Sequence, residues 1–110
     1  MKKIYICSPL RGDYKNNIED AKRHCRTVAL KGFIPIAPHI YLTQFLDDTS
    51  DVERQIGTEM GLELLKDCDA VWVYGEPTEG MRNEIRLAER LGIKVKEILM
   101  KGNYAKKKSI

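Results

Sequence analysis

Cysteine is scarce in this sequence, and its three copies show no paired spacing. Cys7, Cys25 and Cys68 are an odd number, and they form no Cys-x-x-Cys motif. A disulfide framework needs pairs of cysteines, and a zinc knuckle needs closely spaced ones. The sequence therefore argues against both, and we expect reduced, mostly buried thiols. Cys7 ends the first expected strand, and we interpret it as a packing residue because no obvious histidine partner accompanies it.

Long apolar runs are also missing. None approaches the roughly 20 residues that cross a bilayer. The apolar stretch after Met1-Lys2-Lys3 ends at Ser8-Pro9, too early for a signal peptide. The composition, 43% hydrophobic and 32% charged over 110 residues, is typical of one ordinary globular domain. We therefore expect a single domain over residues 1–100, a cytoplasmic location and no membrane partner.

The body of the chain lacks an excess of positive charge. The net charge is +3, but four of the 19 basic residues lie in the last ten positions, so the first hundred carry −1. A nucleic-acid-binding surface needs clustered basic residues. Specific nucleic-acid binding is therefore not expected, and residues 101–110 are interpreted as a solvated Lys-rich tail. A nucleic-acid accessory role for that tail is the weakest of the hypotheses considered.

Short apolar segments alternate with helical patterns along the rest of the chain. Strands are expected over residues 3–7, 33–37, 70–74 and 93–99, and helices over about 18–31, 51–66 and 78–91. This alternation predicts an α/β protein, a three-layer flavodoxin-like or Rossmann-like sandwich with a parallel sheet of four to five strands. The expected strand order is 2-1-3-4, with the second strand at an edge because it contains Pro35.

The connection over residues 38–50 is long for so small a domain. Connections of this length tend to be functional or to contain a short helix of their own. His39, Asp47 and Asp48 lie in it. They are too few and too irregularly spaced to predict a metal site. Capping and loop-anchoring roles are expected for them, and the functional alternative is a lid over the crevice.

Two loops are expected to meet at the switch point between the first and third strands, where open α/β sheets bind ligands. The first contains Ser8, Arg11 and Gly12, whose hydroxyl, guanidinium and turn amides suit a phosphate or carboxylate. The alternative is a surface arginine beside a simple turn. The loop matches neither a Walker motif nor Gly-x-Gly-x-x-Gly. The sequence therefore argues against binding of ATP or of a dinucleotide, and no cofactor is expected.

The second loop leads into the third helix. Thr78 suits the N-cap position, and the N–H groups that follow, including those of Gly80 and Met81, could hold an anion or simply be capped. Glu84 lies on the same helical face as these two residues, near the boundary between core and crevice. A carboxylate there needs partners or a task. The alternative, which the position alone favours, is a surface glutamate paired with a neighbouring arginine.

The chain resembles the nucleoside 2-deoxyribosyltransferase superfamily over about residues 3–96. The motifs that carry the resemblance are residues 3–12 (KIYICSPLRG), residues 68–73 (CDAVWV) and Thr78-x-Gly80-x-x-x-Glu84-Ile85-x-x-Ala88. The chain is most similar to an uncharacterised bacterial and phage branch, with Pro38-His39-x-Tyr41, Phe45-Leu46-x-Asp48 and residues 60–65 (MGLELL) as its marks. Among enzymes, the 2'-deoxynucleoside 5'-phosphate N-hydrolases resemble it most.

The resemblance implies an N-glycosidic bond hydrolase or deoxyribosyltransferase that acts on nucleosides or nucleoside 5'-monophosphates. It implies that Glu84 is the nucleophile, that Tyr5 orients it, and that a second copy of the chain closes the pocket in a homodimer or larger homo-oligomer. The substrate-binding residues implied are Ser8, Pro9, Arg11, Gly12, His39, Asp48, Thr78, Gly80 and Met81.

One position departs from the family pattern. An aspartate that assists the departing base in the family is replaced by Gly61. Glu59 is close in sequence but should point elsewhere, whereas Asp48 could reach in from the long connection. General acid catalysis contributes typically about 10²–10⁴-fold to rate. The alternative function is therefore a non-catalytic nucleotide-binding module on the same fold.

Overall fold

Four parallel strands form one sheet in the order β2-β1-β3-β4. The computed structural model describes residues 1–99, so the tail predicted over 101–110 lies outside the described residues. The elements are β1 (Lys3–Cys7), α1 (Tyr14–Leu30), β2 (Ile34–Ile36), α2 (Pro38–Leu42), α3 (Asp51–Lys66), β3 (Ala70–Tyr74), α4 (Glu79–Arg90) and β4 (Lys94–Ile98). The predicted fold class and strand order are confirmed, and the strand containing Pro35 lies at the edge as expected.

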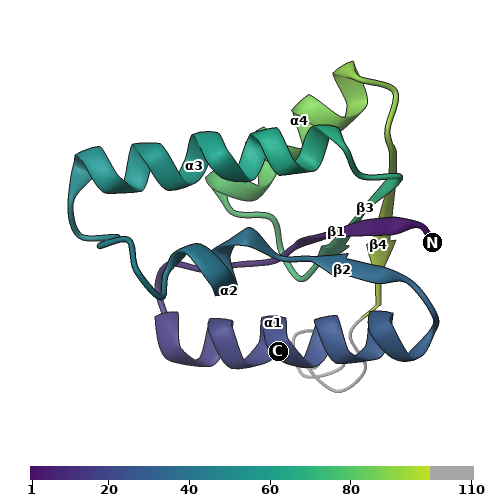
Figure 1. Ribbon diagram of the computed structural model, residues 1–110, viewed down its shortest axis with the longest axis horizontal. Coiled ribbons are helices and arrows are strands. Elements are labelled where there is room, and N and C mark those ends of the chain that lie inside the picture. Colours follow the sequence, from purple (N-terminus) through teal and green to yellow (C-terminus); the bar gives the residue numbers. More distant parts are fainter. Residues whose placement is uncertain (100–110) are drawn as a thin grey trace.

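Helices cover both faces of the sheet. Figure 1 shows α1 on one side and α3 and α4 on the other. Successive residues of β1 alternate between these faces because side chains of a strand point to opposite sides. Ile4 and Ile6 belong to a buried cluster with Val28 of α1, whereas Tyr5 and Cys7 belong to the core beneath α3 and α4. The pleat of β1 therefore brings Tyr5 and Cys7 together on one face.

The long connection contains a short helix of its own, one of the two alternatives expected for a connection of this length. The helix α2 begins at Pro38, which suits a first helical turn because the missing N–H has no partner to lose there. It packs against both α1 and α3. Figure 1 shows it beyond the end of the sheet, beside the start of α1. This placement brings His39 to the carboxyl end of β1.

The helix α3 has the predicted bounds but presents an unexpected face to the core. Its apolar residues at intervals of four, which predict the helix, stay partly exposed. Gly61 and Leu65 are its buried residues instead. The exposed apolar residues are Val52, Ile56, Met60 and Leu64, with 71%, 37%, 48% and 43% of their surface accessible. We call these four residues the α3 stripe.

None of the described helices is long and apolar enough to span a bilayer.

Candidate functional site

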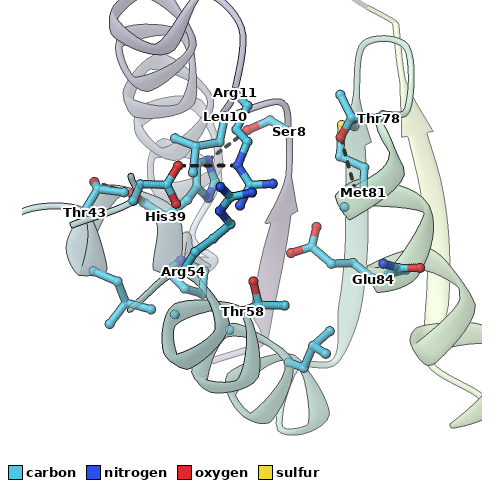
Figure 2. Close-up of a pocket in the computed structure, with 18 of the residues that line it drawn as sticks. Ser8, Leu10, Arg11, His39, Thr43, Arg54, Thr58, Thr78, Met81 and Glu84 are labelled. Atoms are coloured by element: carbon cyan, nitrogen blue, oxygen red, sulfur yellow. Dashed lines mark hydrogen bonds and ion pairs between the residues drawn. The ribbon is translucent and has the colours of Figure 1, made fainter. Parts of the chain in front are cut away.

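A cavity of about 350 Å³ opens at the carboxyl end of β1. It lies between α2, α3 and the first turns of α4, at the switch point predicted from the strand order. Figure 2 shows side chains from these elements around one space, with Glu84 on one side and Arg11, His39 and Arg54 on the other. Of the predicted site residues, the cavity is lined by Tyr5, Ser8, Arg11, His39, Asp48, Thr78, Gly80, Met81 and Glu84.

Glu84 faces the sheet and not a neighbouring arginine. The hydroxyl of Tyr5 donates a hydrogen bond of 2.5 Å to Oε2 of Glu84, and the thiol of Cys7 donates one of 3.3 Å to Oε1. The two arginines nearest to Glu84 along α4 are engaged elsewhere: Arg82 donates to the carbonyl of Pro77, and Arg86 to the side chain of Asn83. The surface-glutamate alternative is therefore wrong.

Burial governs the protonation of this group of side chains. It raises the pKa of Glu84 to about 7, although the hydrogen bonds from Tyr5 and Cys7 act in the opposite direction by stabilising the carboxylate. Burial, and then the charge of Glu84, raises the pKa of Tyr5 well above its usual value. Tyr5 therefore keeps its proton and acts as a donor, while Glu84 changes charge near neutral pH.

Ser8 and His39 form a second hydrogen-bonded pair in the lining of the cavity. A hydrogen bond of 3.1 Å joins Oγ of Ser8 and Nε2 of His39, although the two residues are 31 positions apart. Burial, with a smaller effect of the charge of His24, lowers the pKa of His39 to about 4. His39 is therefore a neutral imidazole at physiological pH and brings a polar ring to the cavity without a charge.

The cationic side of the cavity comes from Arg11 and Arg54. Nε of Arg11 lies 3.4 Å from a carboxylate oxygen of Asp48, in a loose and partly exposed ion pair. Arg54 lies in the first turn of α3, where a terminal nitrogen is 3.4 Å from the exposed Asp51. Nε of Arg54 is buried and has no hydrogen-bond partner within the part of the chain that the structure describes. A buried N–H group without an acceptor lowers the stability of the folded protein unless a ligand accepts its hydrogen bond.

Thr78 is the N-cap of α4, as predicted. Its side chain accepts a hydrogen bond of 3.3 Å from the backbone N–H of Met81, and Met81 in turn places its sulfur 3.4 Å from the N–H of Thr78. The N–H of Met81 is thus capped by the protein. Space remains above Gly80, where an added Cβ would meet no atom within 4 Å.

Two predicted binding residues do not line the cavity. Pro9 and Gly12 belong to the loop after β1 but are not among the lining residues. Gly12 has a φ of +94°, a conformation that glycine adopts readily and other residues rarely do. The glycine therefore allows the turn that lies between Arg11 and the start of α1.

The sequence did not single out Cys7 or Arg54 as site residues. The signal that pairs Cys7 with Tyr5 is their spacing of two residues on one strand, which puts both side chains on the same face of the sheet. Nothing in the sequence distinguishes Arg54 from the other charged residues of α3. Among residues 1–99, no group of three or more metal-ligating side chains is close enough to hold a metal ion.

A family model described as "Domain of unknown function (DUF7768)" matches residues 2–98. The chain belongs to this family.

Two solved structures show the same fold. The 2-deoxyribosyltransferase from Bacillus psychrosaccharolyticus superposes with a TM-score of 0.70 at 16% identity, over 94% of this chain and 80% of that one. A 2-deoxyribosyltransferase from Leishmania mexicana gives a TM-score of 0.66 at 18% identity, over 89% of this chain and 64% of that one, so the chain spans under two thirds of its length. No curated protein matches the sequence. The fold is thus that of nucleoside 2-deoxyribosyltransferases.

Proposed function

We propose that the protein cleaves the N-glycosidic bond of a nucleoside or nucleoside 5'-monophosphate, with Glu84 as nucleophile. The observation that carries this proposal is the carboxylate of Glu84, held by Tyr5 and Cys7 at the wall of a cavity. The fold shared with 2-deoxyribosyltransferases supports it. A cavity of about 350 Å³ is of the size that small-molecule ligands occupy.

The chemistry follows from the position of the carboxylate. An oxygen of Glu84 attacks the anomeric carbon as the bond to the base nitrogen breaks, and the base leaves with the electron pair of that bond. Water then cleaves the glycosyl ester and releases the sugar, or a second base accepts it. The first step needs the ionised carboxylate. Since the pKa of Glu84 is raised to about 7, base release rises with pH through that range.

The opposite side of the cavity favours a 5'-monophosphate over an uncharged nucleoside. Arg11 and Arg54 direct two guanidinium groups into the same space, and the buried Nε of Arg54 has no partner in the described part of the chain. Guanidinium groups bind phosphate through pairs of parallel N–H bonds. The carboxylate of Asp48 is the competing partner of Arg11, and a phosphate would displace it or share Arg11 with it.

Gly61 favours the alternative function, a nucleotide-binding module without turnover. It lies beside Tyr5 where the resembling enzymes have an aspartate, and it brings no proton to the departing base. Asp48 is engaged by Arg11, and the neutral His39 has already lost the proton that an imidazolium would give. For the proposed enzyme, the same lack of a proton donor predicts slow turnover, with bases that leave readily as the better substrates.

A homodimer is also proposed, as the resemblance implies. The α3 stripe supports it, because four partly exposed apolar residues at intervals of four form a ridge that can pack against the same ridge of a second copy. Light scattering of the protein and of Ile56→Lys tests this. A dimer that becomes a monomer in the variant supports the proposal, and a monomeric native protein contradicts it.

The central experiment incubates the purified protein with 2'-deoxynucleoside 5'-monophosphates and the matching nucleosides, and measures the free base by chromatography. Release of base that disappears in Glu84→Ala supports the enzyme. Arg82→Ala is the matched control, because Arg82 lies on the same helix and bonds Pro77. Tight binding with no base released, even at high protein concentration, rejects the enzyme and leaves the binding module.

A further inference from the structure

Two donors on one strand hold the two oxygens of Glu84 separately. Tyr5 and Cys7 are two positions apart on β1, so their side chains point to the same face of the sheet. Met81, Glu84 and Ala88 of α4 lie over this face, and Glu84 meets both donors: Tyr5 at Oε2 and Cys7 at Oε1. A carboxylate with one donor on each oxygen cannot rotate without losing a hydrogen bond.

We propose that Cys7 is a positioning residue for Glu84, whose thiol donates to Oε1 and, together with Tyr5, sets the plane of the carboxylate and favours its ionised form. The effect of Cys7 on catalysis, unlike its hydrogen bond to Glu84, rests on the proposed function. Cys7 is fully buried and does not line the cavity, so it acts through Glu84 and does not contact the substrate. The carbonyl of Met81 is a second acceptor within reach of the thiol, but at 3.8 Å it is farther away than Oε1 at 3.3 Å.

The proton needed for this role stays on the sulfur. Burial, reinforced by the charge of Glu84, raises the pKa of the Cys7 thiol far above its usual value. The thiol is therefore a donor throughout the physiological range and not a thiolate nucleophile. Cys7 and Met81 both belong to the buried core, and the thiol is the side-chain donor within hydrogen-bond distance of Oε1 among the described residues.

Other charged or titratable groups line the same cavity as Glu84. Those of the lining are Arg11 on the loop after β1, His39 on α2, Asp48 on the long connection, Glu53 and Arg54 on α3, and Glu79 on α4. Gly61, the α3 residue beside Tyr5, brings no charge. All of these stay unchanged when Cys7 is substituted, so a change in the titration of Glu84 reports on the thiol.

The test is a titration of the Glu84 side-chain carboxyl by carbon NMR of protein labelled at glutamate, with the signal assigned from Glu84→Gln. Cys7→Ala removes the donor, whereas Cys7→Ser keeps one. Cys25→Ala is the control, since Cys25 packs on the other face of the sheet. We expect a higher pKa of Glu84 in Cys7→Ala, and a native or lower one in Cys7→Ser and Cys25→Ala. Cys7→Val fills the space of the sulfur and replaces Cys7→Ala if that variant fails to fold.

Activity gives the second readout. A hydrogen bond to a charged group contributes enough that Cys7→Ala should release base about tenfold more slowly near pH 7, and its pH profile should move to higher pH. Cys7→Ser should recover most of this loss. A purely structural role predicts that the alanine and serine variants lose activity alike, with an unmoved pH profile.

Each outcome separates this inference from the proposed function. If the pKa of Glu84 responds as expected but the native protein releases no base, the thiol still positions the carboxylate and the proposed enzyme fails. If the native protein releases base but the pKa of Glu84 is the same in Cys7→Ala, or rises as much in Cys7→Ser, the inference about Cys7 is wrong and the enzyme remains.

Discussion

The two walls of the cavity are built in opposite ways. The carboxylate wall consists of Tyr5 on β1 and Glu84 on α4, with Cys7 of β1 buried behind them as the second donor to Glu84, all on regular elements that pack in the core. The cation wall consists of Arg11, His39, Asp48 and Arg54, from the loop after β1, from α2 and its connection, and from the first turn of α3. One wall rests on a central strand, and the other rests on connections and on the ends of helices.

The difference shows in the hydrogen bonds. In the carboxylate wall each oxygen of Glu84 has a donor, at 2.5 Å and 3.3 Å. In the cation wall the ion pair of Arg11 and Asp48 is 3.4 Å long, with 55% of the arginine side chain accessible, and Arg54 keeps a buried donor without a partner in the described chain. The carboxylate wall is complete without a ligand, whereas the cation wall retains bonding capacity for one. A reacting group needs the first arrangement, and recognition of an anion needs the second.

The largest expected effect comes from removing the charge of the carboxylate wall. The pKa of Glu84 is raised to about 7 in the folded protein, so the native state holds its proton more tightly than the unfolded chain does. The contribution of the Glu84 carboxyl to the free energy of unfolding is therefore fully present at low pH and is lost as pH rises toward and through 7. Glu84→Gln should raise the free energy of unfolding at pH 8.5 by on the order of 3 kcal/mol and change it little at pH 4.

Urea denaturation of both proteins at the two pH values measures this difference. The lowered pKa of His39 reduces stability as pH falls from 6.5 toward 4, but it does so equally in both proteins and cancels. Glu89→Gln, an exposed substitution on the same helix, is the control. An equal gain from Glu84→Gln at both pH values would mean that Glu84 is not a buried charge.

The next effect concerns the shorter of the two bonds to Glu84. Tyr5→Phe keeps the ring in the core but removes the hydroxyl that donates at 2.5 Å. A hydrogen bond to a charged group contributes about 1.5–3 kcal/mol, so base release should fall about 10- to 100-fold. Chromatographic initial rates measure it, with Tyr74→Phe on the opposite face of the sheet as the control. Native rates in Tyr5→Phe would show that the carboxylate wall needs no donor from this residue.

The carboxylate wall was largely predictable from the sequence. The alternation of strands and helices gave the order of the sheet, and that order placed the ends of β1 and β3 together. Helical spacing from Thr78 placed Glu84 on the face that meets them. The sequence could not decide whether the carboxylate of Glu84 points toward the sheet or pairs with an arginine. That orientation depends on whether β1 provides hydrogen-bond donors on the facing side. The family resemblance supplied that choice.

The cation wall was less predictable for a physical reason. Arg11, His39 and Asp48 were named, but their pairing depends on the path of a 13-residue connection, which no local periodicity sets. Arg54 was missed because the apolar residues of α3 suggest a different inner face. The α3 stripe stays at the surface, and the glycines at 57 and 61 let that side of the helix border the cavity. Hydrophobic spacing predicts a helix reliably, but a helix that lines a cavity need not turn its apolar stripe inward.

A smaller expected effect, on ligand affinity, tests whether the donor of Arg54 in the cation wall, unpaired within the described chain, binds a phosphate. Arg54→Gln should weaken binding of a nucleoside 5'-monophosphate about tenfold and leave binding of the matching nucleoside unchanged, because only the phosphate loses a partner. Calorimetry with both ligands measures this. Arg26→Gln, exposed on α1, is the matched control. Equal weakening of both ligands would place Arg54 in the architecture of α3 and not in recognition of the phosphate.

The smallest expected effect is the change in stability on substitution of Gly61, a lining residue of α3 that lies beside Tyr5. A Cβ added there would be 3.5 Å from the hydroxyl of Tyr5 and 3.8 Å from Pro38, which are ordinary contact distances. Gly61→Ala should therefore fit and stabilise α3 by about 0.5–1 kcal/mol, because alanine loses less conformational freedom in a helix than glycine does. Urea denaturation measures the gain, and base release should stay within about twofold of native. A loss of stability would mean that the wall needs the glycine for close packing. If the gain is found, packing against Tyr5 and Pro38 does not explain why this position carries no Cβ.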